Sequence, residues 1–254
     1  MSNEAHPVAL VTGGSRGIGA AIVRTLITEG WDVLFTYRSD VAAAQALTEH
    51  HSAAQLAPRC AAVSCDVSVE ADVLAAFARC DALYGRIDAL VNNAGVVDRK
   101  IRVDELTVAR IERMFAVNVT GTMICAREAV RRMSTIHGGQ GGAIVNISSA
   151  ASRIGSPGEY VDYAAAKGAV DTFTVGLALE VVAEGIRVNG VRPGVIDTEI
   201  HASGGQPDRA ARVAKLIPMQ RPGTAQEVAN MVAFLCSPKA SYMTGAIIDV
   251  SGGR

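Results

Sequence analysis

The segment EYVDYAAAKGAV at positions 159–170 places a tyrosine hydroxyl and a lysine amine where they could exchange a proton with a substrate. Tyr163 lies four residues before Lys167, and residues four apart on a helix lie one above the other on the same face. A nearby cation favours the phenolate, so we expect the amine to lower the pKa of the phenol from about 10. The pair predicts a general acid and base that works close to neutral pH.

A second tyrosine in this segment, Tyr160, shares roughly the same helix face. It would lie about 10 Å along the axis from Lys167. It also follows the sequence SPGE, which predicts that it precedes the helix. We therefore expect Tyr163 to perform the chemistry and Tyr160 to form at most a wall of the substrate pocket.

The segment VALVTGGSRGIGAAIV near the N-terminus has the spacing of a dinucleotide-binding turn, GxxxGxG, between a predicted strand and a predicted helix. Glycines let the backbone approach a pyrophosphate, whose charge would face the N-terminus of the helix. The Lys-Ser/Thr pair of a nucleotide-hydrolysing P-loop does not follow these glycines, which argues against that class. The residues expected to form the turn are Gly13, Ser15, Arg16, Gly17, Ile18 and Gly19.

The end of the second predicted strand, FTYRSD, favours NADP(H) over NAD(H). An NAD site normally places an acidic residue about 20 positions beyond the glycines, but Tyr37 and Arg38 occupy that place here. Arg38, with Arg16 facing it from the glycine turn, suits the dianionic 2′-phosphate of NADP(H). The nearby acid, Asp40, is expected to cap the helix that begins at Val41. NAD(H) remains the alternative.

Two more strand ends are expected at the same site. In CDV (65–67), Asp66 is placed beside Val67 to accept a hydrogen bond from an adenine amino group. In NNAG (92–95), Asn93, Ala94 and Gly95 form a turn of small residues past which a ribose could run. Each is an ordinary strand-end turn when taken alone, but their order behind the glycine turn favours binding.

Short β-rich runs alternate with amphipathic helical patterns, which predicts one α/β domain over residues 1–254. Apolar residues make up 49% of the 254 and aromatic residues only 4%, as suits a parallel sheet buried on both faces. Right-handed crossovers make this a doubly wound, seven-stranded parallel sheet with helices on both faces. The predicted strands are 8–12, 32–37, 61–67, 87–93, 142–148, 186–194 and 245–253. The predicted helices are 16–29, 41–57, 69–84, 104–136 (as two helices), 162–184 and 225–236.

One segment, residues 197–223, interrupts this alternation after the sixth strand. Ligands of open parallel sheets bind outside the carboxyl ends of the strands. An insertion there is therefore expected to act as a lid over the substrate, with a plain surface excursion as the alternative.

The composition argues against several other classes. The net charge is −1 and no basic block is present, so nucleic acid is not an expected partner. The five cysteines form no CxxC pair and are expected to be reduced thiols of a cytoplasmic protein. No export leader and no apolar run of about 20 residues are visible, so no membrane association is expected. The histidines lack metal-ligand spacing, and no metal is expected.

The motifs TGGSRGIG, NNAG, FAVNVTG, NISS, YxxxK and VRPGVIDT occur in the order found in the short-chain dehydrogenase/reductase family. The chain resembles this family over essentially its whole length, and the 3-oxoacyl-carrier-protein reductases and glucose-1-dehydrogenase-like members most of all. The resemblance implies a Rossmann fold, a nicotinamide cofactor and usually a homotetramer. It also implies hydride transfer between the nicotinamide and a small-molecule carbonyl or alcohol.

The resemblance further assigns roles to residues. It implies that Tyr163 is the acid/base and that Lys167 lowers its pKa and holds the nicotinamide ribose. Ser149 would polarise the carbonyl, with Ser148 as the alternative, because Ser149 lies 14 residues before the tyrosine, one more than the commonest spacing. Asn118 would hold a water that relays protons to the lysine. The residues matching the segment that grips the nicotinamide carboxamide are Pro193, Ile196 and Thr198.

The sequence leaves the substrate open among a sugar, a polar ketone and an acyl carrier. Arg99, Lys100 and Arg102 form a small basic cluster that could hold an acidic carrier protein, or could simply be a solvated surface. Because SPGEYVDY adds bulk and a carboxylate beside the pocket, we expect that acyl thioesters are not the best substrates. The competing class is a catalytically silent dinucleotide-binding regulator, which the retention of all four catalytic positions disfavours.

Overall fold

The computed structural model describes residues 6–51, 59–199, 205 and 208–254. Its centre is a seven-stranded sheet in the order β3-β2-β1-β4-β5-β6-β7, and every neighbouring pair is parallel. The predicted doubly wound sheet is therefore confirmed. The strands are β1 (Val8–Val11), β2 (Asp32–Tyr37), β3 (Cys60–Ser64), β4 (Ala89–Asn92), β5 (Gly142–Ile147), β6 (Ile186–Pro193) and β7 (Ile247–Val250).

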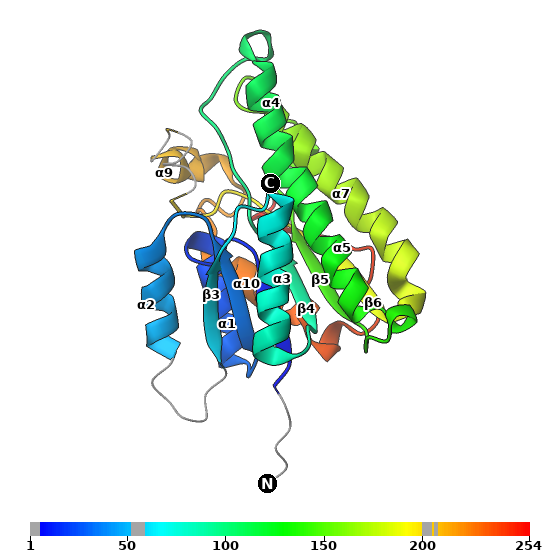
Figure 1. Cartoon of the computed structure of the whole chain (residues 1–254). Coiled ribbons are helices and arrows are strands. Elements are labelled where there is room, and N and C mark those ends of the chain that lie inside the picture. Colours follow the sequence, from blue (N-terminus) through cyan, green and yellow to red (C-terminus); the bar gives the residue numbers. More distant parts are fainter. Residues whose placement is uncertain (1–5, 52–58, 200–204, 206–207) are drawn as a thin grey trace.

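Helices cover both faces of the sheet (Figure 1). On one face α1 packs against α10, with α2 beside them, and on the other lie α3, α5 and α7. The helices are α1 (Gly17–Thr28), α2 (Val41–His51), α3 (Glu70–Tyr84), α4 (Val108–Phe115), α5 (Gly121–Met133), α6 (Ala151–Ile154), α7 (Val161–Val181), α9 (Arg209–Val213) and α10 (Ala225–Cys236).

Alternate side chains of each strand enter two separate cores. In β1, Val11 packs with Ile22 of α1 on one face, whereas Leu10 packs with Phe77 of α3 on the other. All four of these side chains are at most 1% exposed. Because both faces of the sheet are covered, the strands read as continuous apolar runs without polar alternation.

The predicted helix pair over 104–136 is one rod with an irregular middle. A 3₁₀ turn at Val103–Glu105 comes first, and the Thr107 hydroxyl then accepts a hydrogen bond from the Arg110 backbone N–H at 3.3 Å, which starts α4. A π-helical turn, Ala116–Thr120, joins α4 to α5 without leaving the right-handed helical region. Such π turns are frequent at functional sites.

Two strands end three residues earlier than predicted, and most other strand boundaries differ by one or two residues. β3 ends at Ser64, so residues 65–67, predicted as strand, form the turn beyond it. β7 covers only Ile247–Val250 of the predicted 245–253, since Gly245 has a φ of +72° that a strand does not allow. The last part of the predicted helix 41–57 lies outside the described residues.

Candidate active site

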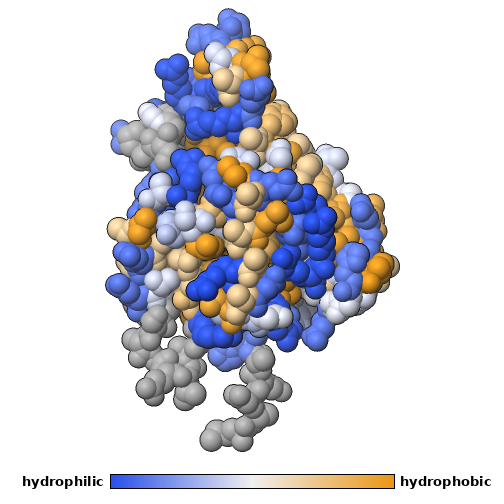
Figure 2. All heavy atoms as spheres, viewed as in Figure 1, coloured by the Kyte–Doolittle hydropathy of each residue, from blue (hydrophilic) through white to orange (hydrophobic). Residues whose placement is uncertain are grey.

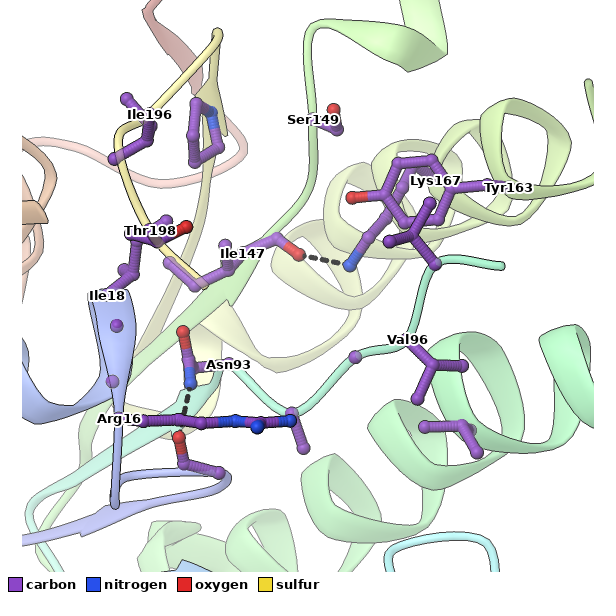
Figure 3. Close-up of a pocket in the computed structure, with 18 of the residues that line it drawn as sticks. Arg16, Ile18, Asn93, Val96, Ile147, Ser149, Tyr163, Lys167, Ile196 and Thr198 are labelled. Atoms are coloured by element: carbon purple, nitrogen blue, oxygen red, sulfur yellow. Dashed lines mark hydrogen bonds between the residues drawn. The ribbon is translucent and has the colours of Figure 1, made fainter. Parts of the chain in front are cut away.

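A pocket lies along the carboxyl ends of the strands, where open parallel sheets bind ligands. It brings together nearly every residue that the sequence singled out, and Figure 3 shows ten of the residues that line it by name. The predicted residues in the lining are Gly13, Ser15, Arg16, Gly17, Ile18, Gly19, Arg38, Asp66, Val67, Asn93, Ala94, Gly95, Ser149, Tyr163, Lys167, Pro193, Ile196 and Thr198. Asn118 lies behind this lining.

The glycine turn connects β1 to α1 and leaves no room for a side chain at Gly19. A Cβ at Gly19 would lie 2.2 Å from the Gly13 carbonyl oxygen and 2.6 Å from Asn93 Nδ2. Asn93 Nδ2 in turn donates to the carbonyls of Thr12 and Gly13, both at 2.9 Å, which fixes β4 against the turn. The turn runs into the N-terminus of α1, where no side-chain cap is present at Arg16. Free backbone N–H groups at such an end suit a phosphate.

Charged side chains line the pocket in the glycine turn and after β2. Arg16 belongs to the turn and Arg38 directly follows β2, and both line the pocket. Asp40 also lines it, but its Oδ1 accepts a hydrogen bond from the Ala43 backbone N–H at 3.0 Å, as expected of a helix cap. The residues present therefore fit a dinucleotide, with a glycine turn for the pyrophosphate and two guanidiniums in the lining that can bind phosphate.

Asp66 lies near this positive charge. Its Oδ1 accepts hydrogen bonds from the Ser68 backbone N–H at 3.0 Å and from the Ser68 hydroxyl at 2.6 Å. Burial alone would raise the pKa of Asp66, but the Ser68 hydrogen bonds and the Arg38 charge outweigh it and the pKa is lowered. The side chain is thus an ionised acceptor in the pocket lining.

At the other end of the pocket, Tyr163 and Lys167 extend from α7 towards the end of β5 (Figure 3). Lys167 is 4% exposed, and its Nζ donates to the Ile147 carbonyl at 2.7 Å. The same Nζ lies 5.7 Å from the centre of the Tyr163 ring. The two side chains therefore share one face of α7, as their spacing predicted.

The two candidate serines are separated by their contacts. The Ser149 side chain forms a hydrogen bond that lowers the pKa of Tyr163. Ser148 is only 3% exposed, and its hydroxyl donates to the Lys167 backbone carbonyl at 3.2 Å. This geometry favours Ser149 over Ser148 as the serine that faces the reacting group.

The predicted direction of the tyrosine pKa was wrong for the structure as it stands. Burial is the largest influence and raises the pKa of Tyr163, and the Ser149 hydrogen bond offsets this only in part. Burial also lowers the pKa of Lys167 to about 8, although the Asp171 carboxylate opposes that shift. The phenol is therefore a protonated donor at neutral pH in this state, and the lysine is close to losing its charge.

Asn118 lies in the π turn and is fully buried. Its Nδ2 donates to the carbonyls of Val96 and Met114, both at 3.0 Å, and its Oδ1 accepts from the Val96 N–H at 3.2 Å. A Cβ at Gly95 would lie 2.8 Å from Asn118 Oδ1 and 3.5 Å from Lys167 Nζ. Asn118 thus holds the turn after β4 next to the lysine.

Tyr160 precedes α7, as expected, and is 8% exposed. Its ring meets that of Tyr163 edge-on, with centroids 5.8 Å apart, and it lines the pocket. The sequence predicts that Tyr160 forms a wall of the pocket and that Tyr163 is the reactive group. The structure places both side chains in the pocket lining.

Some lining residues escaped the sequence prediction. They carry no motif, and only their position beyond a strand end could have indicated them. They include Val96, Val97, Ile154 and Arg254.

The predicted lid is described only in part. Residues 200–204, 206 and 207 lie outside the described structure. Of the rest, Thr198 and Glu199 line the pocket, and α9 packs near it through Ala210, which shares a small apolar cluster with Val195 and Ile217. The lid role remains a proposal.

The basic cluster of Arg99, Lys100 and Arg102 is exposed and lies outside the pocket lining. Arg102 pairs with Asp104 at 3.0 Å. Elsewhere in the described residues, no group of three His, Cys, Asp or Glu side chains could hold a metal ion, and no helix is long and apolar enough to cross a membrane.

Comparison with known proteins agrees with this geometry. Residues 13–254 match a family model described as enoyl-(acyl carrier protein) reductase. An uncharacterized oxidoreductase of Escherichia coli, YgfF, is 53% identical over 97% of this chain and 99% of its own length. The fold and these matches show that the chain belongs to the short-chain dehydrogenase/reductase family, and its relatives are named oxidoreductases.

Two similar solved structures are complexes with a nicotinamide cofactor. A short-chain dehydrogenase from Burkholderia cenocepacia in complex with NADP is 34% identical, with a TM-score of 0.89 over 98% of each chain. A 3-ketoacyl-(acyl-carrier-protein) reductase from Brucella melitensis complexed with NADH is 30% identical, with the same TM-score and coverage. The family thus includes proteins seen with either cofactor.

Proposed function

We propose that the protein is an NADP(H)-dependent oxidoreductase that interconverts a small-molecule carbonyl and its alcohol. One observation carries the proposal. A single pocket is lined by a glycine-rich turn and two guanidiniums and also by Ser149, Tyr163 and Lys167. A nicotinamide cofactor, when bound, supplies or accepts the hydride, and the protein supplies position and charge.

In reduction, Tyr163 gives its proton to the substrate oxygen. The burial that raises the pKa of Tyr163 keeps it protonated for this step. Ser149 donates a hydrogen bond to the same oxygen, and this bond strengthens as negative charge builds there. In alcohol oxidation the proton moves the other way, and a charged Lys167 favours the phenolate that must accept it.

Two neighbours complete this machinery. Asn118, by holding the turn after β4 next to Lys167, is placed to support the proton relay that the family resemblance implies. Pro193, Ile196 and Thr198 follow β6 along the pocket wall and would grip the carboxamide. Both roles are parts of the same proposal.

The preference for NADP(H) over NAD(H) is supported by charge. Arg16 and Arg38 line the pocket where a 2′-phosphate would lie, and the nearest acid, Asp40, caps α2. An acidic residue that binds the ribose hydroxyls would instead repel that phosphate. The Burkholderia structure in complex with NADP supports this choice, and the Brucella structure complexed with NADH leaves NAD(H) as the alternative.

For the substrate, we propose a compact ketone or its alcohol rather than a carrier-linked acyl thioester. Ser156 and Tyr160 line the pocket, so part of the segment SPGEYVDY forms its wall, which supports this preference. Glu159 is not in the lining, so bulk supports this preference and the expected carboxylate does not. The Brucella relative makes a 3-oxoacyl-carrier-protein reductase the alternative to be tested.

We also propose a homotetramer located in the cytoplasm. Exposed apolar side chains on α7 support association, because Leu179 is 74% exposed and Val182, just beyond the helix, is 45% exposed. Figure 2 shows hydrophobic residues mixed with hydrophilic ones on this side of the molecule. The five cysteines are free thiols, as suits a reducing compartment.

A panel of ketones, aldehydes and alcohols, assayed with NADPH and NADH, tests the proposal. We expect turnover with NADPH and compact ketones, and little with acetoacetyl thioesters. Rapid turnover of a carrier-linked β-ketoacyl thioester would replace the proposed substrate class. Tight binding of NADPH without turnover of any panel member would favour the silent regulator instead.

A further inference from the structure

Asp171, one helical turn beyond Lys167 on α7, is 8% exposed. Its Oδ2 accepts hydrogen bonds from Arg192 of β6, from Nε and from Nη2, both at 2.9 Å. Its other oxygen, Oδ1, is buried and has no hydrogen-bond partner in the part of the chain that the structure describes. A carboxylate with one unpaired buried oxygen is costly unless another positive charge lies close to it.

The sheet places that charge nearby. Lys167 donates to the Ile147 carbonyl at the end of β5, and Ile147 is in register with Val191 of β6. The next residue on β6 is Arg192, which binds Asp171. The Lys167 amine is thus held by strand β5 and the Asp171 carboxylate by the adjacent strand β6. The two residues are four positions apart on α7, one helical turn.

We propose that Asp171 is a positioning residue for Lys167: it supplies the negative charge that keeps the buried amine protonated, and the Arg192 guanidinium bound to it offsets part of that charge. The consequence for turnover rests on the role proposed above for the lysine. The charge state of the amine itself does not depend on that role.

The groups facing Lys167 come from every element packed around it. Tyr163 and Asp171 lie on the same helix, and Arg192 lies on β6. Asn118 of the π turn and the Ile147 carbonyl are neutral. Farther out, Arg192 reaches Asp249 of β7 at 3.9 Å, Asp249 also pairs with Arg153 of α6, and Arg110 pairs with Asp162 at the start of α7 at 2.7 Å. Of these charges, only Asp171 is a carboxylate on α7 that lies one turn from the amine.

Burial lowers the pKa of Lys167 to about 8, and the Asp171 charge acts against this shift. A fall of about one unit from that value, on loss of the negative charge, would leave about half of the amine neutral at pH 7. A carboxylate at this position therefore sets how much of the amine is charged beside the phenol.

The chain has four lysines (Lys100, Lys167, Lys215 and Lys239), so the experiment can observe the amine directly. Lysine labelled with 13C at Cε gives four signals, and the Lys167 signal is assigned by its loss in Lys167→Met. We expect a titration midpoint near 8 in the wild type. In Asp171→Asn the midpoint should fall by about one pH unit, as for the loss of one close opposite charge.

Arg192→Gln gives the opposite sign. The substitution removes the positive charge that offsets the carboxylate of Asp171, so the titration midpoint of Lys167 should rise. A merely structural pair would lower stability in both variants without shifting the midpoint in opposite directions. If Asp171→Asn fails to fold, Arg192→Gln tests the proposal alone.

Asp32→Asn is a matched control. Asp32 is also a buried carboxylate bound by an arginine, Arg59, at 2.8 Å. It is the first residue of β2 and so lies at the amino ends of the strands, whereas the pocket lies at their carboxyl ends. It should lower stability and leave the Lys167 midpoint unchanged.

An unchanged midpoint in Asp171→Asn, or shifts of the same sign in Asp171→Asn and Arg192→Gln, would overturn the proposal. Opposite shifts in a protein that turns over no carbonyl would instead uphold this inference and refute the proposed function.

Discussion

The Lys167 side-chain amine donates a hydrogen bond to the carbonyl of Ile147 at 2.7 Å, which ties helix α7 to the end of strand β5. The backbone carbonyl of the same lysine accepts from the Ser148 hydroxyl at 3.2 Å. One residue is thus held to β5 through both its side chain and its backbone. This double tie fixes the distance between the amine on the helix and the serine that follows the strand.

Changing Gly19 to alanine should damage the cofactor cradle. The new Cβ would lie 2.2 Å from the Gly13 carbonyl oxygen, so the backbone of the turn must shift. We expect the affinity for NADPH, measured by fluorescence titration, to fall at least about tenfold, which corresponds to about 1.4 kcal/mol of binding free energy.

Gly176→Ala is the control for this substitution, because a Cβ there meets nothing within 4 Å. It lies inside α7 and should stabilise the protein by roughly 0.5–1 kcal/mol while NADPH binding stays the same. Unchanged NADPH affinity in Gly19→Ala would show that the turn does not hold the pyrophosphate.

Replacing Arg38 by alanine should alter the choice of cofactor. A hydrogen bond to a charged group contributes about 1.5–3 kcal/mol, so the KM for NADPH should rise about 10- to 100-fold. The KM for NADH should change little, since NADH lacks the 2′-phosphate. Arg24, exposed on α1 and outside the pocket lining, provides the matched control as Arg24→Ala. Equal losses with both cofactors would contradict the proposed phosphate contact.

The buried lysine should make stability depend on pH. Burial holds the pKa of Lys167 at about 8 in the folded protein, below the value of 10.5 expected for an exposed lysine. Between these two values the unfolded chain binds the additional proton, so the free energy of unfolding rises with pH through that window. The full gain would be on the order of 3 kcal/mol.

Measuring this requires a comparison, because burial raises the pKa of the Cys65 and Cys80 thiols to about 12 in the folded protein, whereas thiols of the unfolded chain ionise near the ordinary value of 9.0, within this range. The difference in unfolding free energy between wild type and Lys167→Met should therefore be followed from pH 7 to pH 10. We expect the wild type to gain stability relative to the variant as the pH rises. A flat difference would mean that the amine is not held in a desolvated site.

Most of the fold could be predicted from the pattern of the sequence. The glycine turn, the Tyr163–Lys167 spacing and the seven apolar runs each encode local geometry, and helix α10 falls on the predicted 225–236. The helix cap at Asp40 was also readable, because capping depends on residues three positions apart.

Properties that depend on burial could not be read in this way. The pKa of Tyr163 is raised because the packed site desolvates the ring, and no spacing reveals that. The serine pair could be separated only once the contact between Ser148 and Lys167 was visible. The pairing of Asp171 with Arg192 joins residues 21 positions apart on different elements, which local patterns do not record.

The most direct test of the proposed chemistry removes one oxygen atom. Tyr163→Phe keeps the ring that packs against Tyr160 and deletes the hydroxyl that gives or takes the proton. With the best ketone of the panel, NADPH oxidation should slow by about 10²- to 10⁴-fold, while the affinity for NADPH stays close to that of the wild type. Equal turnover by the two proteins would contradict the assignment of Tyr163 as the acid and base.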